Sequence, residues 1–346
     1  MFLDSNSLKT SEKCLNSNYI MMMKRVNFYF LLASLLLLAP SALSQQSTCT
    51  ADSIKSWLAF LASDEMKGRT NGSQEIEKVA EWLSVKYKQY GLQHFGKMND
   101  FSQSYILNND SSFVHKNIVG YIPSINKSDN DSHVIVLSAH FDHIGMRFSP
   151  VNGDSIFNGA DDNASGIVAM LAIAKTLFEQ KLQPDSPIVF AAFSNEERGR
   201  LGSRYFCNSN VIPIQKIKIN INFEMLGRSD EFGKNKYYIT GHEYSNFQDI
   251  VVDFNKDRDW EIVDVGGIVN MLFRMSDNYS FVECATRSNY CVPAHTIATS
   301  VGMGRHVHQL HDEVEYIDFD NLSNAVINLT QLILYVAGKN ILVKCN

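Results

Sequence analysis

Histidine and carboxylate residues follow apolar segments at five separated places in the chain. In chain order they are His140, Asp161, the pair Glu196 and Glu197, Glu224, and His308. Mixed histidine and carboxylate ligands that come from the carboxyl ends of several strands are what a two-metal hydrolytic centre requires. The residue types and their order therefore predict a site for metal-assisted hydrolysis.

Strands and helices alternate along the chain after residue 45. Apolar runs predict strands over residues 133–139, 187–193, 217–223, 237–240 and 294–298. Helical spacing of apolar residues predicts helices over 53–61, 76–87, 166–178, 247–254 and 320–336. This alternation predicts an α/β fold, with one domain whose mostly parallel, mixed central sheet is flanked by helices on both faces.

Open parallel sheets bind their ligands outside the carboxyl ends of the strands. His140, Glu196 and Glu224 each fall at or just past such an end. Three successive strand ends with ligand-type residues, joined by a GADDNASG loop, favour a site over isolated structural residues. The loop also allows a plainer interpretation, an Asx turn that caps the next helix. Both interpretations are compatible if one of Asp161 and Asp162 caps the helix and the other binds metal.

The first 44 residues have the pattern of an upstream extension followed by a secretory signal peptide. Lys24 and Arg25 precede an apolar run over 28–38, and small residues follow as far as Ser44. The run is too short for a stable membrane anchor, which needs about 20 apolar residues. A short buried helix is the alternative. We expect a signal segment over 1–44, a catalytic domain over 45–346, and a secreted or periplasmic protein.

Charge and cysteine content narrow the partners and the chemistry. The chain has 31 Lys and Arg against 37 Asp and Glu, a net charge of −6, and no basic block beyond the N-terminal region. Nucleic acid is therefore excluded as an expected partner. No CxxC pair is present, which argues against a cysteine zinc site.

Export would place the remaining cysteines in an oxidising compartment. Such a compartment permits a local Cys284–Cys291 bridge and a Cys49–Cys345 bridge between the termini, with Cys207 left over. Ordinary buried thiols are an equally weighted alternative.

These segments resemble the co-catalytic di-zinc aminopeptidase family, family twenty-eight of the metallopeptidases. Its relatives include leucine-type aminopeptidases, glutamate carboxypeptidases and, more distantly, glutaminyl cyclases. The similarity extends to LASDEMKGRTNGSQEIEKVAEWL, NIVGYIP, RMSDNYSF and PAHTIAT, and so covers most of the chain after residue 45. Five separated motifs in the same order make the resemblance specific.

The resemblance implies two zinc ions per chain. One ion would be bound by His140 and Glu224 and the other by Glu197 and His308, with Asp161 bridging the two. His306 and His311 are rivals of His308, which we prefer because HQLHDEV fits the closing motif of the family.

The resemblance also implies how the reaction proceeds. Glu196 would be the general base that takes a proton from a metal-bound water, leaving a metal-bound hydroxide as nucleophile. Asp142 would hydrogen-bond the second ring nitrogen of His140 and so fix its tautomer.

Two positions depart from the family pattern. Many relatives carry Asp where this chain has Glu224, which still supplies a carboxylate oxygen. Many carry a tyrosine where this chain has Val307, and that hydroxyl can stabilise the oxyanion. The zinc ions alone, or Tyr279 or Tyr290, would then have to do so.

The function implied is that of a zinc-dependent exopeptidase that removes N-terminal residues from peptides. A glutaminyl-peptide cyclotransferase, which generally uses one zinc, is the alternative enzyme. A catalytically dead, receptor-like relative is the alternative from another class. The presence of Glu196 and of every ligand argues against a dead site, because a cluster of carboxylates is costly to keep without a use.

Overall fold

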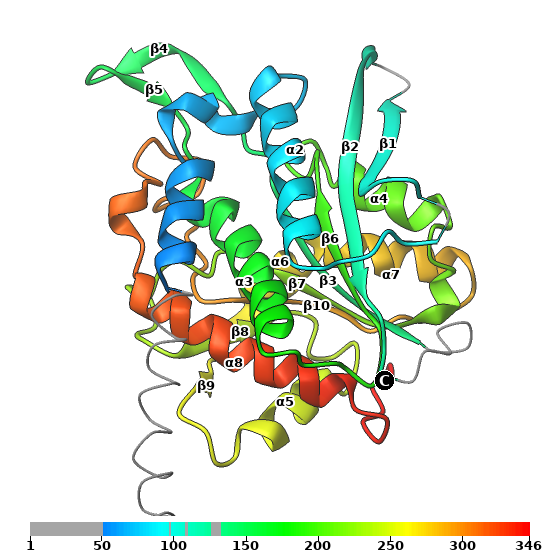
Figure 1. The fold of residues 1–346 in the computed structure, drawn as a ribbon. Helices are drawn as coiled ribbons and strands as arrows, with labels where there is room; N and C mark the ends of the chain where they lie inside the picture. The colour runs from blue at the N-terminus through cyan, green and yellow to red at the C-terminus, as the bar shows by residue number, and fades with distance from the viewer. Residues whose placement is uncertain (1–50, 97, 108–109, 126–132) are drawn as a thin grey trace, which may run out of the picture. The chain divides into compact units, whose positions relative to one another are not determined.

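The computed structural model describes residues 51–346, except residues 97, 108–109 and 126–132. The proposed signal segment and Cys49 lie outside the described residues. The chain from Ala51 to Asn346 is one compact unit. It is built on an eight-stranded sheet with the order β1-β2-β6-β3-β7-β10-β8-β9 (Figure 1).

Four parallel strands form the centre of this sheet. They are β6 (Ile188–Phe193), β3 (Val134–His140), β7 (Ile217–Phe223) and β10 (Ala294–Ala298). At one edge β2 (Asp110–Ile122) and β1 (Ser102–Leu107) add antiparallel, and at the other edge β8 (Lys236–Ile239) adds antiparallel and β9 (Glu261–Ile262) parallel to β8. The mostly parallel, mixed sheet is as predicted. A separate hairpin, β4 (Met146–Val151) and β5 (Asp154–Ile156), projects from the unit (Figure 1).

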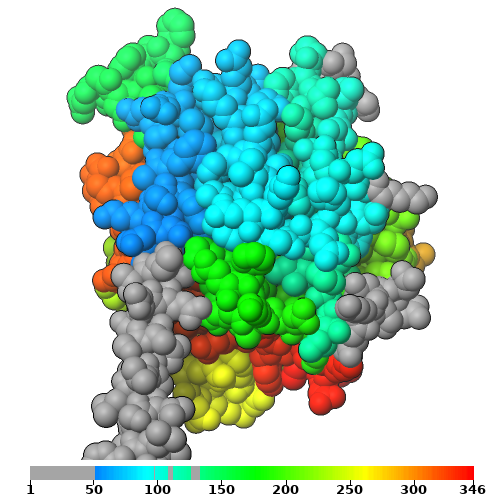
Figure 2. All heavy atoms as spheres, viewed as in Figure 1, coloured from blue at the N-terminus to red at the C-terminus, as the bar shows by residue number. Residues whose placement is uncertain are grey.

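Helices cover both faces of the sheet. On the face turned to the viewer in Figures 1 and 2 lie the helix over 51–61, α2 (Gln74–Gln89), α3 (Gly166–Glu179) and α8 (Phe319–Ala337). On the other face lie α4 (Leu201–Asn208) and α7 (Asn278–Arg287). Alternation along β3 explains the two cores, because Ile135 and Leu137 pack into the first and Val134 and Val136 into the second.

The remaining elements are short. They are α5 (Phe247–Asn255), α6 (Val269–Met275), the turns η1 (Asp64–Arg69), η2 (Ala160–Ser165), η3 (Ile214–Lys216), η4 (Gly266–Ile268) and η5 (Val314–Tyr316). The strands predicted over 217–223 and 294–298 coincide with β7 and β10. Sequence periodicity missed the β4–β5 hairpin because all six side chains of β4 are exposed.

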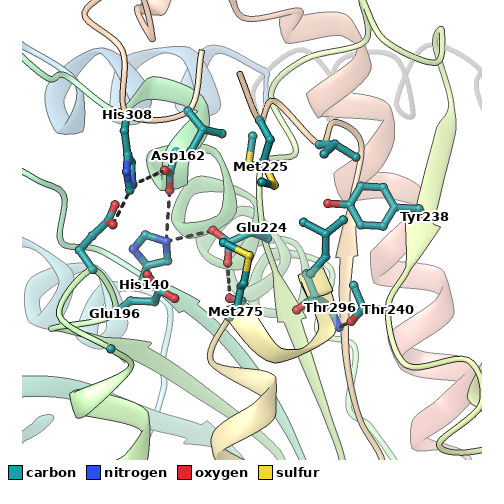
Figure 3. Close-up of a pocket in the computed structure, with 17 residues that line it drawn as sticks. His140, Asp162, Glu196, Glu224, Met225, Tyr238, Thr240, Met275, Thr296 and His308 are labelled. Atoms are coloured by element: carbon teal, nitrogen blue, oxygen red, sulfur yellow. Dashed lines mark hydrogen bonds and ion pairs between the residues drawn. The ribbon is translucent and has the colours of Figure 1, made fainter. Parts of the chain in front are cut away.

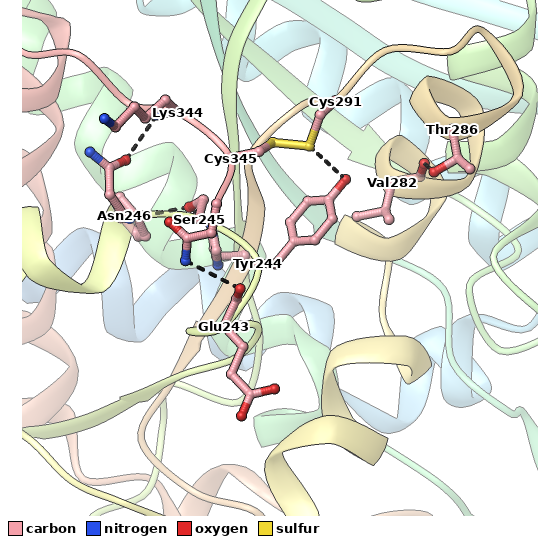
Figure 4. Close-up of a disulfide and its surroundings, with 12 residues drawn as sticks. Glu243, Tyr244, Ser245, Asn246, Val282, Thr286, Cys291, Lys344 and Cys345 are labelled. Atoms are coloured by element: carbon pink, nitrogen blue, oxygen red, sulfur yellow. Dashed lines mark hydrogen bonds between the residues drawn. A yellow bond between two sulfur atoms is a disulfide. The ribbon is translucent and has the colours of Figure 1, made fainter.

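The cysteine pairing differs from both predicted bridges. Cys291 is bonded to Cys345, with an S–S distance of 1.94 Å (Figure 4). Cys207 and Cys284 are free thiols. The prediction of Cys284–Cys291 is wrong, and Cys345 is not free to pair with Cys49. The C-terminus reaches Cys291 because Lys344 and Asn246 exchange two hydrogen bonds, of 2.8 and 3.1 Å, beside the disulfide.

Candidate metal centre

The carboxyl ends of the four parallel strands bring the predicted residues together. His140 is the last residue of β3, and Glu224 directly follows β7. Glu196 and Glu197 lie in the turn after β6, and His308 lies in the loop after β10. Because parallel strands end at the same edge of a sheet, segments that are far apart in sequence meet in one pocket (Figure 3).

Two groups of ligand-type side chains share one aspartate. The first consists of His140, Asp162 and Glu224, and the second of His143, Asp162, Glu197 and His308. A third group, which lacks Asp162, consists of His140, Glu196 and Glu197. Within each group, one ligand atom from every residue lies within 4.8 Å of the others. Nε2 of His140 lies 2.9 Å from Glu224 Oε1, and Nε2 of His308 lies 2.8 Å from Glu197 Oε2.

The aspartate that the two groups share is Asp162, whereas Asp161, which the resemblance implied as the bridging ligand, belongs to neither group. Asp162 Oδ1 lies 3.4 Å from His140 Nε2, and its Oδ2 lies 3.5 Å from His308 Nε2. The carboxylate of Asp161 is fully buried on the other side of the turn. It accepts hydrogen bonds from the backbone N–H of Gly227 at 2.7 Å and the hydroxyl of Ser300 at 2.9 Å.

Three histidines in the closing segment have different surroundings. His306 is buried, and its Nε2 lies 2.9 Å from Asp161 Oδ2. His311 is exposed and its ring contacts Tyr316 edge-on. His308 alone of the three reaches the metal groups. Its pKa is raised mainly by the hydrogen bond with Glu197, which places an anion beside the ring.

Asp142 holds together the residues around the two metal groups. Its carboxylate accepts hydrogen bonds from Asn71 Nδ2 at 2.6 Å and from the backbone N–H groups of Glu196 and Glu197 at 3.1 and 3.3 Å. The closest partner recorded for His140 Nδ1 is the main-chain oxygen of Asp142, at 3.2 Å, and the Asp142 Oδ1 atom lies at 3.7 Å. The main-chain oxygen and the carboxylate of Asp142 therefore both lie beside His140 Nδ1, and the carboxylate also fixes the turn that carries the two glutamates.

His143 is a site residue that the sequence reasoning missed. Its Nδ1 lies 2.9 Å from Glu197 Oε1, and the ring is buried. Burial opposes the charge on Glu197, but hydrogen bonds with His143 and His308 hold its pKa at about 2. The available signal was the second histidine of HFDH, three residues after His140.

Glu196 has the opposite electrostatic surroundings. Burial raises the pKa of its carboxyl group well above the usual value, and the charges of Asp277, Glu197 and Glu224 raise it further against the effect of His140. Two adjacent glutamates thus have pKa values that are shifted in opposite directions. Such divergence is typical of a site in which one carboxylate binds a cation and the other exchanges a proton.

The metal groups form one wall of a cavity of about 290 Å³. The rest of its lining is largely apolar: Met225, Leu272, Met275, Val301, Met303 and Val307. Among the described residues that line it, every charged side chain is Glu196 or belongs to the metal groups. The cavity therefore suits an uncharged, apolar group placed next to the cluster.

Neither tyrosine predicted as an oxyanion donor lines this cavity. Tyr290 lines a different cavity beside Cys291, and the ring of Tyr279 lies 5.2 Å from the guanidinium of Arg200. The tyrosine of the cavity is Tyr238, which sequence reasoning missed (Figure 3). Its hydroxyl already donates to Ser300 O at 3.2 Å.

A mostly parallel α/β sheet with paired histidine–carboxylate groups at its carboxyl edge defines the class of metal-dependent α/β hydrolases. Residues 117–333 match Peptidase family M28, and the chain belongs to this family. It is similar to a probable zinc metalloprotease of Pyrenophora tritici-repentis, with 26% identity over 191 residues that cover 54% of this chain and 43% of the relative. The chain thus spans less than half the length of that relative.

Two solved structures share the fold. The LapA aminopeptidase of Legionella pneumophila superposes with a TM-score of 0.62 at 17% identity, covering 86% of this chain and 75% of LapA. The glutaminyl cyclase of Porphyromonas gingivalis superposes with a TM-score of 0.59 at 16% identity, covering 82% of this chain and 97% of the cyclase. At these identities the comparison concerns the fold, and the activity has to be argued from the site.

Proposed function

We propose that this chain is a zinc-dependent aminopeptidase that uses two metal ions to remove apolar N-terminal residues from peptides. The observation that carries the proposal is the pair of histidine–carboxylate groups that share Asp162, with Glu196 beside them in one cavity. Membership of Peptidase family M28 supports it.

The donor set fits zinc. Imidazole nitrogen and carboxylate oxygen are zinc ligands, and catalytic sites use about three protein ligands per ion. His140, Asp162 and Glu224 would hold one ion, and Asp162, Glu197 and His308 the other, with His143 against Glu197. When bound, zinc polarises the scissile carbonyl group and makes water more acidic.

The chain's own side chains would handle the proton. Glu196 lines the cavity, and burial raises the pKa of its carboxyl group well above that of an exposed glutamate. Glu196 would accept a proton from the attacking water and return it to the leaving amine. Asp142 holds the Glu196 carboxylate in place by accepting a hydrogen bond from the backbone N–H of Glu196.

The apolar wall indicates the substrate class. Met225 and Met275 lie on the side of the cavity away from His308 (Figure 3). Together with Leu272, which also lines the cavity, they would surround the N-terminal side chain. A charged side chain there would lose its hydration without gaining a partner. Leucine- or methionine-type N-termini are therefore the expected substrates.

A combined metal and substrate assay tests this proposal. We expect about two zinc ions per chain, release of free leucine from leucyl substrates, and loss of activity with a chelator that zinc restores. Aspartyl substrates should react about 10²-fold more slowly or worse, because an unpaired charge is costly to bury. A fully active protein that holds one zinc ion and converts glutaminyl peptides to pyroglutamyl peptides would instead establish the cyclotransferase alternative.

Val307 gives a prediction about turnover. Its side chain lines the cavity beside His308 but cannot donate a hydrogen bond. We expect Val307→Tyr to raise kcat on leucyl substrates by up to about 10²-fold, the effect of one oxyanion donor. Steady-state kinetics of Val307→Tyr, Val307→Phe and Tyr238→Phe would test it. A rise in the phenylalanine variant as well would show that ring packing, and not the hydroxyl, is responsible.

We also propose that the protein is exported. Two features support this: the signal-like composition of residues 24–44, and the Cys291–Cys345 disulfide, which an oxidising compartment preserves. The described residues contain no helix that is both long and apolar enough to cross a membrane. N-terminal sequencing of protein from the extracytoplasmic fraction should begin near Gln45, and an intact N-terminus there would contradict signal cleavage.

A further inference from the structure

Arg69 is a buried arginine that reaches two of the metal-bearing segments at once. It ends the η1 turn and has no exposed surface. Its N–H groups donate to five main-chain carbonyl oxygens, those of Leu61, Phe141, Asn158, Gly159 and Asp162. A guanidinium group has five N–H donors, so these bonds use its full capacity.

The acceptors belong to the segments that carry the metal groups. Phe141, whose oxygen lies 2.9 Å from Arg69 Nε, sits between His140 and Asp142. Gly159 and Asp162, whose oxygens lie 2.7 and 3.3 Å from Nη2, belong to the turn that presents the shared aspartate. One planar group thus sets the distance between the end of β3 and this turn.

The backbone around Arg69 adds to the same connection. The oxygen of Arg69 accepts the N–H of His143 at 3.3 Å, and the oxygen of Gly68 accepts the N–H of Gly145 at 3.1 Å. Gly68 has φ +66°, and a Cβ on it would lie 2.3 Å from Gly145 O and 2.6 Å from Phe157 O. Only glycine allows this close approach, which brings Arg69 between the two segments.

The guanidinium of Arg69 hydrogen-bonds only neutral carbonyl oxygens among its described partners, and carboxylates act on its charge from a greater distance. Burial lowers its pKa, while Asp162, Asp312, Asp142 and Glu197 oppose that effect in this order. A buried cation without a direct carboxylate partner is costly, so packing alone does not explain it. A need to join two ligand segments explains why this residue is arginine. The planar guanidinium can donate in several directions at once, whereas the three donors of lysine lie on one atom.

We propose that Arg69 is a positioning residue that sets the spacing between the His140–His143 segment and the Asp162 turn, and thereby the affinity for the metal ions. This inference rests on the proposed zinc function. It adds a residue that touches neither substrate nor metal and acts through the main chain of the ligand segments.

Arg69→Lys separates geometry from charge, because it keeps the cation and removes the fork. We expect zinc affinity to fall by roughly 10–100-fold, the usual cost of losing an outer partner of a metal ligand. Zinc binding is measured by competition with a chromophoric chelator, and kcat and KM are measured at saturating zinc. Arg204→Lys is the matched control, since Arg204 makes a partly exposed ion pair with Glu283 on α7. We expect it to bind zinc as the unmodified protein does.

Arg69→Gln guards against misfolding of the lysine variant. Glutamine is neutral, so no buried cation is left without partners, and it has two N–H donors in place of the five of arginine. We expect the same loss of zinc affinity in this variant. Unchanged zinc affinity and unchanged kcat in a folded variant, with only a lower thermal midpoint, would overturn the proposal. So would failure of both variants to fold with zinc present, since Arg69 would then support the whole fold. If the unmodified protein itself binds no zinc, the proposed function fails instead.

Discussion

Glu196→Gln is expected to lower kcat by about 10²–10⁴-fold while the protein keeps its zinc. The glutamine side chain has nearly the same size but cannot accept a proton from water. The Glu196 carboxylate lies within one group with His140 and Glu197, but it belongs to neither of the two groups that share Asp162, so we expect both of those groups to stay intact. Steady-state kinetics on leucyl substrates, together with elemental analysis of the same preparation, test this expectation.

Glu197→Gln is the matched control at the next position. Its carboxylate lies 2.9 Å from His143 Nδ1 and 2.8 Å from His308 Nε2, inside the second metal group. We expect this variant to lose zinc first and activity as a consequence, so that added zinc partly restores it. Loss of zinc in Glu196→Gln and retention of zinc in Glu197→Gln would reverse the assignment of the two roles.

Asp162→Asn is expected to weaken zinc binding more than the roughly 10–100-fold that loss of an outer partner costs, because the shared carboxylate faces both groups. The amide retains the size of the side chain but removes the negative charge that the two proposed ions would share. Isothermal titration of the zinc-free protein with zinc measures the effect. Activity should be lost in parallel at limiting zinc.

Asp161→Asn changes the residue next to Asp162, and we expect it to affect stability and not zinc binding. Asp161 faces Gly227, Ser300 and His306 and no metal group. We expect it to bind both zinc ions and to unfold more easily, by up to the roughly 3–5 kcal/mol that breaking a buried charge pair costs. Equal loss of zinc in the two variants would mean that the turn moves as a unit and that its two faces are not distinct.

The sequence by itself determined the framework and most of the site. Nearly continuous apolar runs identified β3 and β6, because strands covered on both faces are mostly apolar. Ligand-type residues directly after predicted strands, as at His140 and Glu224, then have to meet, since parallel strands end at one edge. The length of α8 was equally readable from its 3.6-residue periodicity.

Only the tertiary structure decided which neighbouring side chain faces the site. Asp161 and Asp162 are adjacent and chemically identical, and the turn after Gly159, which has φ +61°, directs one to the core and the other to the metal groups. His143 and Arg69 became site residues through partners 54 to 93 positions away in sequence. The disulfide partner of Cys345 depended on where the C-terminus packs. Local sequence carries no record of such distant contacts, because packing sets them only after the elements have formed.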